Sequence, residues 1–320
     1  MVKRNEWADA ELIGLDWGSS SLRAMLIGAN GAVLETRSST QGASTLDGSA
    51  AAFVTVLDAL IGDWREALPQ LPIWACGMVG SQHGWREVPY ASCPTDAAAL
   101  AASALTVAWH DRTVRLLPGL RCETAVGVPD VMRGEETQVL GALELDSDLK
   151  KRCCIVMPGT HSKWAQVADG SVRSFATHMT GELFAVLRQH SVLGRLMPSD
   201  SVATPQAFEA GVLSARSGAA TGLMHQMFAV RTLGLTGRLA GAALPDYLSG
   251  LLIGHELHAG LHWRGRAQLG TAPLLLVGEP ELCRRYALAF KLFDQGAVRV
   301  LPNTAATGLW RLSRATQGVL

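Results

Sequence analysis

The chain lacks a net charge, since 28 lysine and arginine residues balance 28 aspartate and glutamate residues. A partner held by bulk charge, such as nucleic acid or an anionic membrane surface, is therefore not expected. Lysine itself is scarce, because only 5 of the basic residues are Lys and 23 are Arg. This asymmetry is more typical of genome composition than of a particular chemistry.

Long apolar runs are also missing. No stretch reaches the ~18 consecutive apolar residues of a membrane span, and residues 1–11 lack the apolar core of a signal peptide. The six cysteines form no CxxC pair, and Cys153 directly precedes Cys154, which is a poor start for a disulfide framework. These absences predict a reduced, soluble, cytoplasmic protein with no membrane partner.

The two common nucleotide-binding signatures are absent as well. The sequence contains neither GxxxxGK[ST] nor GxGxxG, which excludes a P-loop and a Rossmann fingerprint. Any handling of phosphate must therefore depend on another feature.

A repeated strand–turn–strand unit is what the sequence offers instead. An apolar run, a Gly-hydroxyl turn, a second run and a tight turn occupy residues 12–37 and recur from residue 153. Asn-Gly and Asp-Gly turns of this kind are strong hairpin signals. At ~150 residues per domain, a chain of 320 residues has room for two domains. We predict a duplicated α/β architecture with domains at 1–150 and 151–320.

The remaining elements alternate between helices and strands before the chain becomes mainly helical. The apolar spacing predicts helices over 49–68, 95–105 and 135–145 in the first half. In the second half it predicts helices over 181–196, 205–216, 220–233, 245–263, 281–293 and 304–312.

Each repeat carries a glycine followed by a hydroxyl residue between its strands. Backbone N–H groups and hydroxyls in such a turn form a nest suited to phosphate. The candidate residues are Gly18, Ser19 and Ser20 in the first copy and Gly159, Thr160, His161 and Ser162 in the second. Arg23 and Lys163 follow the turns and could offset phosphate charge, although solvated strand residues would look the same.

The copies differ at Asp16, which aligns with Met157. One carboxylate beside a phosphate cradle suits Mg²⁺ held through water, and a strand-end cap is the alternative. A general base could come from Glu135, Glu136 or Asp130, which lie around a turn-to-helix junction, with Glu135 our first choice. Acidic residues in a first helical turn are also common for dipole reasons alone.

Two further features admit a functional and a structural interpretation. The loop that begins at Gly77 follows a predicted strand, where ligand contacts are frequent. Its candidates are Gly80, Ser81, Trp85 for a sugar face and Arg86 for a carboxylate, but an ordinary packed loop is equally compatible. His255, His258 and His262 share a helix face, yet HExxH would need His at Ala259, so zinc is disfavoured.

Several motifs, in one order along the chain, resemble a known family. IGLDWGSS (13–20) is similar to the first phosphate motif of the sugar kinase, actin and heat-shock chaperone ATPase superfamily. GMVGSQHGW (77–85), DVMRGEETQ (130–138), PGTHSKW (158–164), MTGELF (179–184) and YLSGLLIG (247–254) are more specific. Together they resemble the 2-dehydro-3-deoxygalactonokinase family.

This resemblance implies a kinase of galactonate breakdown. The enzyme would transfer the ATP γ-phosphoryl group to the terminal hydroxyl of 2-dehydro-3-deoxy-D-galactonate. The resemblance also implies two ribonuclease H-like domains around a central cleft, ATP and Mg²⁺ as cofactors, and a nucleotide near Gly278 of the second domain. A homodimer is possible. A kinase for another sugar or keto sugar acid, and a nucleotide-driven switch or chaperone, are the alternatives.

Overall fold

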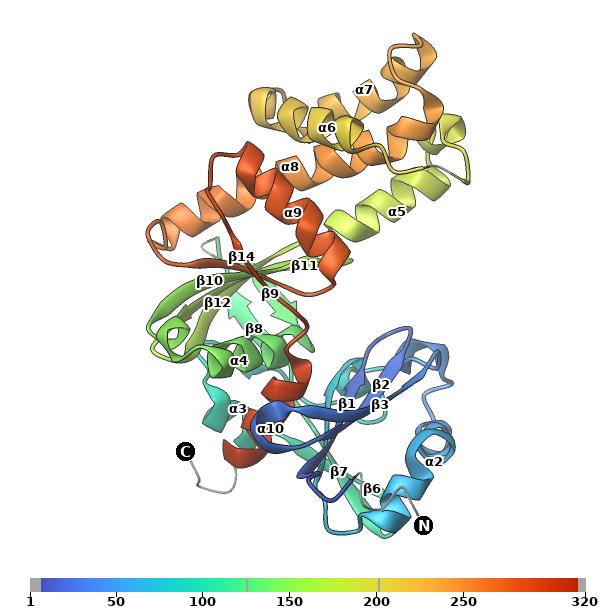
Figure 1. Cartoon of the computed structure of the whole chain (residues 1–320), viewed down its shortest axis with the longest axis vertical. Coiled ribbons are helices and arrows are strands. Elements are labelled where there is room, and N and C mark those ends of the chain that lie inside the picture. The colour runs from blue at the N-terminus through green and yellow to red at the C-terminus, as the bar shows by residue number, and fades with distance from the viewer. Residues whose placement is uncertain (1–6, 125, 201, 316–320) are drawn as a thin grey trace. The chain divides into compact units, whose positions relative to one another are not determined.

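A computed structural model describes residues 7–124, 126–200 and 202–315 of the chain (Figure 1). The chain divides into two compact units. Unit 1 comprises the described residues of Met1–Cys153, Ala165–Phe175 and Asn303–Leu320, and unit 2 comprises those of Cys154–Trp164 and Ala176–Pro302. Each unit is described separately below.

Unit 1 is built on a six-stranded sheet in the order β3-β2-β1-β4-β7-β6. Its central strand β1 (Leu12–Trp17) is antiparallel to β2 (Leu22–Ile27) and parallel to β4 (Ile73–Gly77). The apolar side chains of β1 are buried, as a continuous apolar run predicts for a strand covered on both faces. The edge strands are β3 (Val33–Ser39) and β6 (Leu105–Trp109), and β7 (Arg112–Leu116) lies between β4 and β6.

The hairpin from β2 to β3 turns where the Asn-Gly signal predicts it. Asn30 and Gly31 have φ values of 57° and 77°, which is the positive-φ pair that such a tight turn requires. Asp169 and Gly170 have φ values of 53° and 71° at the corresponding turn of the second repeat. Both predicted turns are therefore confirmed.

Four α-helices lie in the described part of unit 1. They are α2 (Ala50–Ala67), α3 (Ala97–Ala102), α4 (Glu135–Leu145) and α10 (Ala305–Ala315). The C-terminal helix α10, red in Figure 1, packs against α4. A Cβ atom at Gly141 would lie 2.1 Å from the Thr304 carbonyl oxygen, and one at Gly308 would lie 1.9 Å from the Thr137 carbonyl oxygen. The two glycines thus allow backbone contact between α4 and the start of α10.

The second large sheet repeats the strand order of the first. Its order is β12-β11-β10-β13-β14, which matches β3-β2-β1-β4-β7 element by element. The strands are β10 (Arg152–Met157), β11 (Ser162–Ala168), β12 (Ser171–His178), β13 (Leu274–Val277) and β14 (Arg299–Leu301). β10 is parallel to β13, and β13 is parallel to β14. The predicted duplication of a ribonuclease H-like α/β domain is confirmed.

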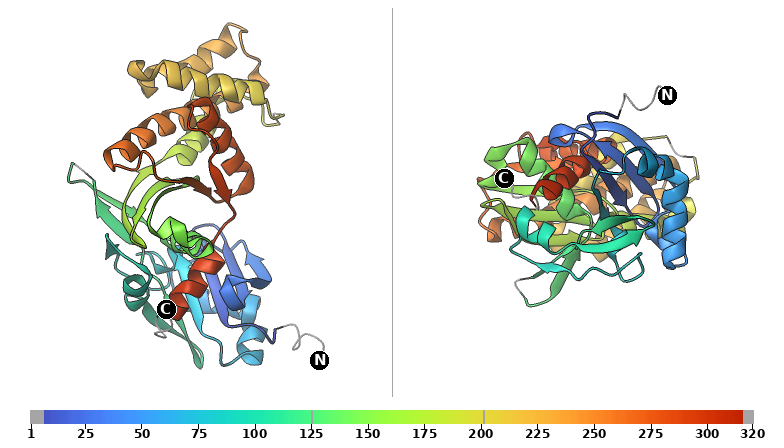
Figure 2. Two further views of the ribbon diagram at one scale, coloured as in Figure 1. Left: turned by 60° about the vertical axis from the view of Figure 1, so that its left-hand side comes forward. Right: turned by 90° about the horizontal axis from the view of Figure 1, so that it is seen from below.

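Unit 2 is rich in helices, as the sequence predicts. They are α5 (Thr180–His190), α6 (Pro205–Ser217), α7 (Leu223–Leu235), α8 (Leu244–Arg266) and α9 (Pro280–Leu292). The gold helix α6 lies alongside the orange α8 in the views of Figures 1 and 2. Gly211, Gly250 and Gly254 permit this approach, because a Cβ at any of them would clash with the facing helix.

Two parts of the first half differ from the prediction. The helix predicted over 95–105 is only α3, and the chain enters strand β6 at Leu105. A small sheet of β5 (Ala91–Ser92), β8 (Leu120–Glu123) and β9 (Pro129–Met132) was not expected from the sequence. The domain boundary at residue 150 stays a prediction.

Candidate active site

Asp16 lies at the carboxyl end of β1, where the parallel neighbour β4 also ends. Its register partners are Arg23 on β2 and Cys76 on β4. The Cys76 thiol points at the Asp16 carboxylate, with 3.9 Å between Sγ and Oδ1. Burial raises the pKa of Asp16, and the charge of Glu135 raises it further, while Arg23 opposes both effects. Asp16 is therefore a carboxylate in a setting that favours a nearby cation.

Helix α4 begins beside this strand end through a glycine. Gly134 precedes the helix with φ +109°, and a Cβ there would lie 3.3 Å from the Gly77 Cα at the end of β4. A side chain would be strained at this φ and tight against β4. The glycine thus brings the first two residues of α4, Glu135 and Glu136, to the end of the sheet.

The two carboxylates at the start of α4 both turn back onto the backbone before the helix. The Arg133 N–H donates to Glu135 Oε2 at 3.0 Å, and the Gly134 N–H donates to Glu136 Oε2 at 2.7 Å. These bonds satisfy donors that have no partner within the helix. Glu136 is only 1% exposed, and Thr137 Oγ1 donates to its other oxygen at 3.1 Å. Glu136 is therefore enclosed, whereas Glu135 is half-buried.

Glu136→Gln is expected to flatten the pH dependence of unfolding. Burial, with help from the charge of Glu135, raises the pKa of Glu136 from 4.5 to about 8. The neutral carboxyl stabilises the folded state fully below the unfolded pKa, and this stabilisation is lost as the pH rises toward the folded pKa. Glutamine stays neutral, so thermal melts should show the Tm of the variant gaining on that of the wild type by several degrees between pH 5 and pH 8. Each pH unit inside this window costs the wild type up to ~1.4 kcal/mol, and ~1 kcal/mol shifts the Tm of a domain of 150–250 residues by roughly 2–4 °C. A Tm difference that is constant with pH would contradict the assignment.

The first Gly-hydroxyl turn is tied down through its carbonyl groups. Ala43 N donates to Gly18 O at 2.9 Å, and Ser44 N donates to Ser19 O at 3.0 Å. Ser19 and Ser20 are exposed. The turn therefore has a fixed backbone and presents hydroxyl side chains to solvent, as a phosphate cradle requires.

The loop after β4 packs against Arg133. A Cβ at Gly80 would lie 3.0 Å from Arg133 Nη1, and Arg133 Nη2 donates to the Val88 carbonyl at 2.8 Å. Ser81 is half-buried, and Arg86 is exposed. The loop candidate Gly80 thus lies close to Arg133, two residues before α4 begins.

Trp85 is placed in the core rather than on an open surface. It is 9% exposed, and its ring stacks on Phe53 with centroids 5.9 Å apart and planes 4° apart. Trp17 contacts the same ring edge-on at 6.5 Å. The ring of Trp85 therefore packs the loop onto the sheet.

The second Gly-hydroxyl turn separates its residues into two groups. Thr160 and His161 are exposed, and His161 Nε2 lies 2.5 Å from Glu182 Oε2. Ser162 and Lys163 are buried at 0% and 4% exposure, and Lys163 Nζ donates to the His161 carbonyl at 3.2 Å. The predicted cofactor-binding residues Ser162 and Lys163 therefore lie behind the turn and support it.

Helix α5 and Gly278 border this turn. Glu182 N donates to Thr160 O at 3.0 Å. A Cβ at Gly181 would lie 2.5 Å from Gly159 O, and one at Gly278 would lie 3.7 Å from Pro158 O. The sequence therefore folds so that Gly159, Thr160 and Gly278, three of the predicted nucleotide-binding residues, come together.

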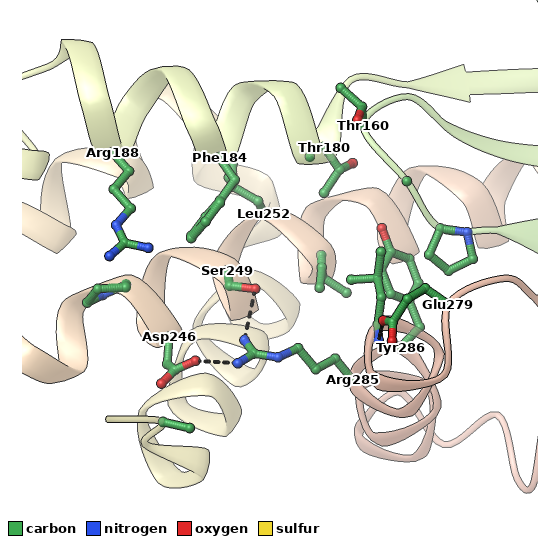
Figure 3. Close-up of a pocket in the computed structure, with 17 residues that line it drawn as sticks. Thr160, Thr180, Phe184, Arg188, Asp246, Ser249, Leu252, Glu279, Arg285 and Tyr286 are labelled. Carbon is green, nitrogen blue, oxygen red and sulfur yellow. Dashed lines mark hydrogen bonds and ion pairs between the residues drawn. The ribbon is translucent and has the colours of Figure 1, made fainter. Parts of the chain in front are cut away.

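A cavity of about 650 Å³ in unit 2 opens beside the turn (Figure 3). Thr160, Thr180 and Tyr286 lie at one end, Arg188 and Asp246 lie at the other, and Phe184 and Leu252 lie between them. Arg285 Nη2 pairs with Asp246 Oδ1 at 2.8 Å and Nη1 donates to Ser249 Oγ at 3.4 Å. Polar groups at both ends and apolar side chains in the middle suit an elongated ligand with an apolar, planar part.

The carboxylates of unit 1 fit a hard cation. Mg²⁺ prefers oxygen ligands and is commonly held by one or two carboxylates together with substrate phosphates and water. Asp16 and Glu135 meet this chemistry, since the charge of Glu135 raises the pKa of Asp16 and a cation would relieve that repulsion. Within the described ranges, no group of three or more His, Cys, Asp or Glu side chains could hold a metal ion. His255 Nε2 instead lies 2.6 Å from Gln226 Oε1.

Several residues of these sites were missed by sequence reasoning. Cys76 carries no motif of its own, and Arg133 stood inside a motif without an assigned role. Arg285, Asp246 and Tyr286 come from two helices, and only the folded chain shows that they line one cavity.

None of the helices in the described part of the chain is sufficiently long and apolar to span a membrane.

The two sheets with matching strand order define a duplicated ribonuclease H-like α/β fold, as the sequence predicts. The 2-keto-3-deoxy-galactonokinase family model matches residues 16–312, so the chain belongs to that family of carbohydrate kinases. It is 37% identical over 318 residues to a probable 2-dehydro-3-deoxygalactonokinase of Rhizobium meliloti (strain 1021), covering 93% of this chain and 97% of that protein. It is 35% identical over 296 residues to the 2-dehydro-3-deoxygalactonokinase of Escherichia coli (strain K12), covering 92% and 94%.

A solved structure agrees with this assignment. A crystal structure from Sinorhizobium meliloti, provisionally named a 2-dehydro-3-deoxygalactonokinase, superposes with a TM-score of 0.82 at 36% sequence identity. The match covers 96% of this chain and 99% of that one. The family resemblance predicted from the motifs is confirmed.

Proposed function

We propose that this chain transfers the γ-phosphoryl group of ATP to the terminal hydroxyl of 2-dehydro-3-deoxy-D-galactonate, giving the 6-phosphate. The observation that carries the substrate assignment is the similarity of 35–37% to relatives named for this activity, over more than nine-tenths of the chain. The motifs that contain the candidate residues lie within the matched range of 16–312, apart from positions 13–15 of the motif IGLDWGSS.

Unit 1 would supply the residues that act on the metal and the acceptor hydroxyl. Asp16 would orient Mg²⁺ through water, with Ser19 and Ser20 at the phosphates. Mg²⁺, when bound, supplies neutralisation of the charge on the phosphate oxygens. Glu135 would accept the proton of the attacking hydroxyl, because it is less enclosed than Glu136 and acts electrostatically on Asp16. Arg86, which is exposed on the loop after β4, is the candidate partner of the substrate carboxylate.

Unit 2 would supply the nucleotide site. The cavity beside Thr160 is lined by polar residues at both ends and by apolar residues between them, which suits a nucleoside with phosphates. The exposed Thr160 hydroxyl and the first turn of α5 would face the phosphates. Gly278 would let the backbone between β13 and α9 approach the ligand without a side chain in the way.

A coupled assay of ADP release tests the proposal. The purified chain is supplied with MgATP and, in separate reactions, 2-keto-3-deoxy sugar acids of different stereochemistry and ordinary hexoses. We expect turnover that depends strictly on the sugar acid and is fastest with 2-dehydro-3-deoxy-D-galactonate. Faster turnover with another sugar or keto acid would replace the substrate, and acceptor-independent hydrolysis would favour a nucleotide-driven switch.

A further inference from the structure

A buried glutamate on α8 accepts hydrogen bonds from three different elements of unit 2. Glu256 is 3% exposed. The Trp164 indole N–H on β11 donates to its Oε1 at 2.9 Å, and the Tyr286 hydroxyl on α9 donates to its Oε2 at 2.5 Å. The Thr180 hydroxyl at the start of α5 donates to the same Oε2. A buried carboxylate with this many donors is a strong organising centre, because each bond is charge-assisted.

The packing of α8 fixes where this carboxylate lies. A Cβ at Gly260 would lie 2.4 Å from the Trp164 ring, so the helix can lie against the indole only because residue 260 is glycine. Glu256 stands one turn earlier on the same helix face and meets the indole N–H. The Trp164 ring is held from another side by Phe290, with centroids 5.7 Å apart. The carboxylate is therefore anchored by the hydrophobic core.

The hydrogen bonds continue from Glu256 to the second Gly-hydroxyl turn. The Tyr286 oxygen lies 3.0 Å from Ser162 Oγ, and the Gly159 N–H donates to Ser162 Oγ at 3.4 Å. A phenol has one proton, and Tyr286 gives it to Glu256, so Ser162 must be the donor to Tyr286. The direction is thus defined along the whole series, from the Gly159 N–H through Ser162 and Tyr286 to the Glu256 carboxylate.

Both ends of this network reach the nucleotide cavity. Gly159, Thr160, Thr180 and Tyr286 all line the cavity, and Figure 3 shows Thr160, Thr180 and Tyr286 at its same end. Gly181 packs against the Gly159–Thr160 turn, and Glu182 N donates to the Thr160 carbonyl. Glu256 therefore accepts a hydrogen bond from Tyr286, which supports the turn through Ser162, and another from Thr180, at the start of the helix that packs on the turn.

We propose that Glu256 is a positioning residue for nucleotide binding, which sets the Gly159–Thr160 turn and the start of α5 through Tyr286, Ser162 and Thr180. The proposal rests on the proposed function of the unit 2 cavity as the nucleotide site. A phosphate-binding turn that is already ordered in the free protein binds its ligand more tightly, because less conformational entropy is lost on binding. An amide at position 256 would place donor hydrogens against groups that now donate, so the hydroxyls would have to rotate.

The test is titration calorimetry of the full chain with ADP, together with steady-state kinetics. Glu256→Gln and Tyr286→Phe are each expected to weaken ADP binding about tenfold, equivalent to ~1.4 kcal/mol. The KM for ATP should rise in parallel, while the KM for the sugar acid should stay at the wild-type value. A uniformly damaged fold would not separate the two KM values in this way.

Two controls and a rescue keep the result interpretable. Glu11→Gln alters a similar carboxylate in unit 1, where Trp310 Nε1 donates at 2.8 Å, and His258→Gln alters an exposed residue of α8 itself. Both should bind ADP as the wild type does. Thr180→Val should weaken ADP binding and Thr180→Ser should restore it, and neither change disturbs the buried core around Trp164.

Unchanged ADP binding in folded Glu256→Gln and Tyr286→Phe proteins would overturn the positioning role. If these two variants fail to fold, unchanged ADP binding in Thr180→Val would overturn it instead. Absence of ADP binding by the wild type would instead contradict the proposed nucleotide site. The two failures are therefore distinguishable.

Discussion

Asp16→Asn is expected to lower kcat for phosphoryl transfer by roughly 10²–10³, the usual cost of removing one preorganised electrostatic group. The substitution keeps the shape of the side chain and its place at the end of β1, but removes the negative charge. Without that charge the water shell of Mg²⁺ loses its protein anchor. Initial rates over a range of Mg²⁺ concentrations should show a raised half-saturating concentration as well as the lower kcat.

The environment of Asp16 is the reason for expecting an effect on catalysis more than on folding. Burial and the charge of Glu135 both raise the pKa of Asp16, so the ionised carboxylate is already unfavourable in the free protein. An uncharged amide relieves that repulsion, and the variant should melt at or above the wild-type temperature. Lower activity with unchanged or higher Tm identifies a functional charge.

Asp58→Asn is the matched control for this experiment. Asp58 is a carboxylate of the same unit that accepts from Trp109 Nε1 at 3.0 Å and lies 2.9 Å from His110 Nε2. Its loss should affect stability and leave kcat and the Mg²⁺ dependence unchanged. Near-normal kcat in Asp16→Asn at moderate Mg²⁺ concentrations would rule out the metal-orienting role.

The sheets could be predicted because their strands are continuous buried runs bounded by diagnostic turns. The observed strand β1 begins at Leu12, the first residue of the predicted repeat, and both Gly-containing hairpin turns adopt the positive φ values that their residues favour. The strand β8 was missed because four residues in the pattern LRCE alternate too briefly to be distinguished from loop. β5 has only two residues, and a strand of that length leaves no periodic signal.

Only those parts of the candidate sites that lie within one short sequence motif could be predicted. The turn at Gly159 was found from its sequence, but the sequence treated its residues as equivalent. The start of strand β11 separates them, because Ser162 faces the core while Thr160 and His161 stay exposed. The bonds that support the turn join residues 92, 76 and 30 positions apart, and no local pattern encodes such pairs.

The choice of base among Glu135, Glu136 and Asp130 is narrowed by what their carboxylates contact. Glu136 is enclosed, and both of its oxygens accept hydrogen bonds from neighbouring residues. Asp130 lies on β9, where its Oδ1 accepts from the next backbone N–H, that of Val131, at 2.8 Å. Glu135 alone of the three contributes to the raised pKa of Asp16. A base must stand beside the reacting group, and this coupling favours Glu135.

Glu135→Gln is accordingly expected to lower kcat by ~10²–10⁴, the typical contribution of a positioned general base. Glutamine keeps an oxygen that can accept the Arg133 N–H, so the start of α4 should stay intact and the KM for ATP should change little. Glu136→Gln and Asp130→Asn should retain much more activity in the same ADP-release assay, because Glu136 is enclosed and Asp130 Oδ1 already accepts from the Val131 N–H. If Glu135→Gln turns over at a near-normal rate while one of the other two variants is inactive, the proton is taken by that residue. The backbone around Gly134 would then have to change conformation when substrate binds, so that a different carboxylate reaches the acceptor hydroxyl.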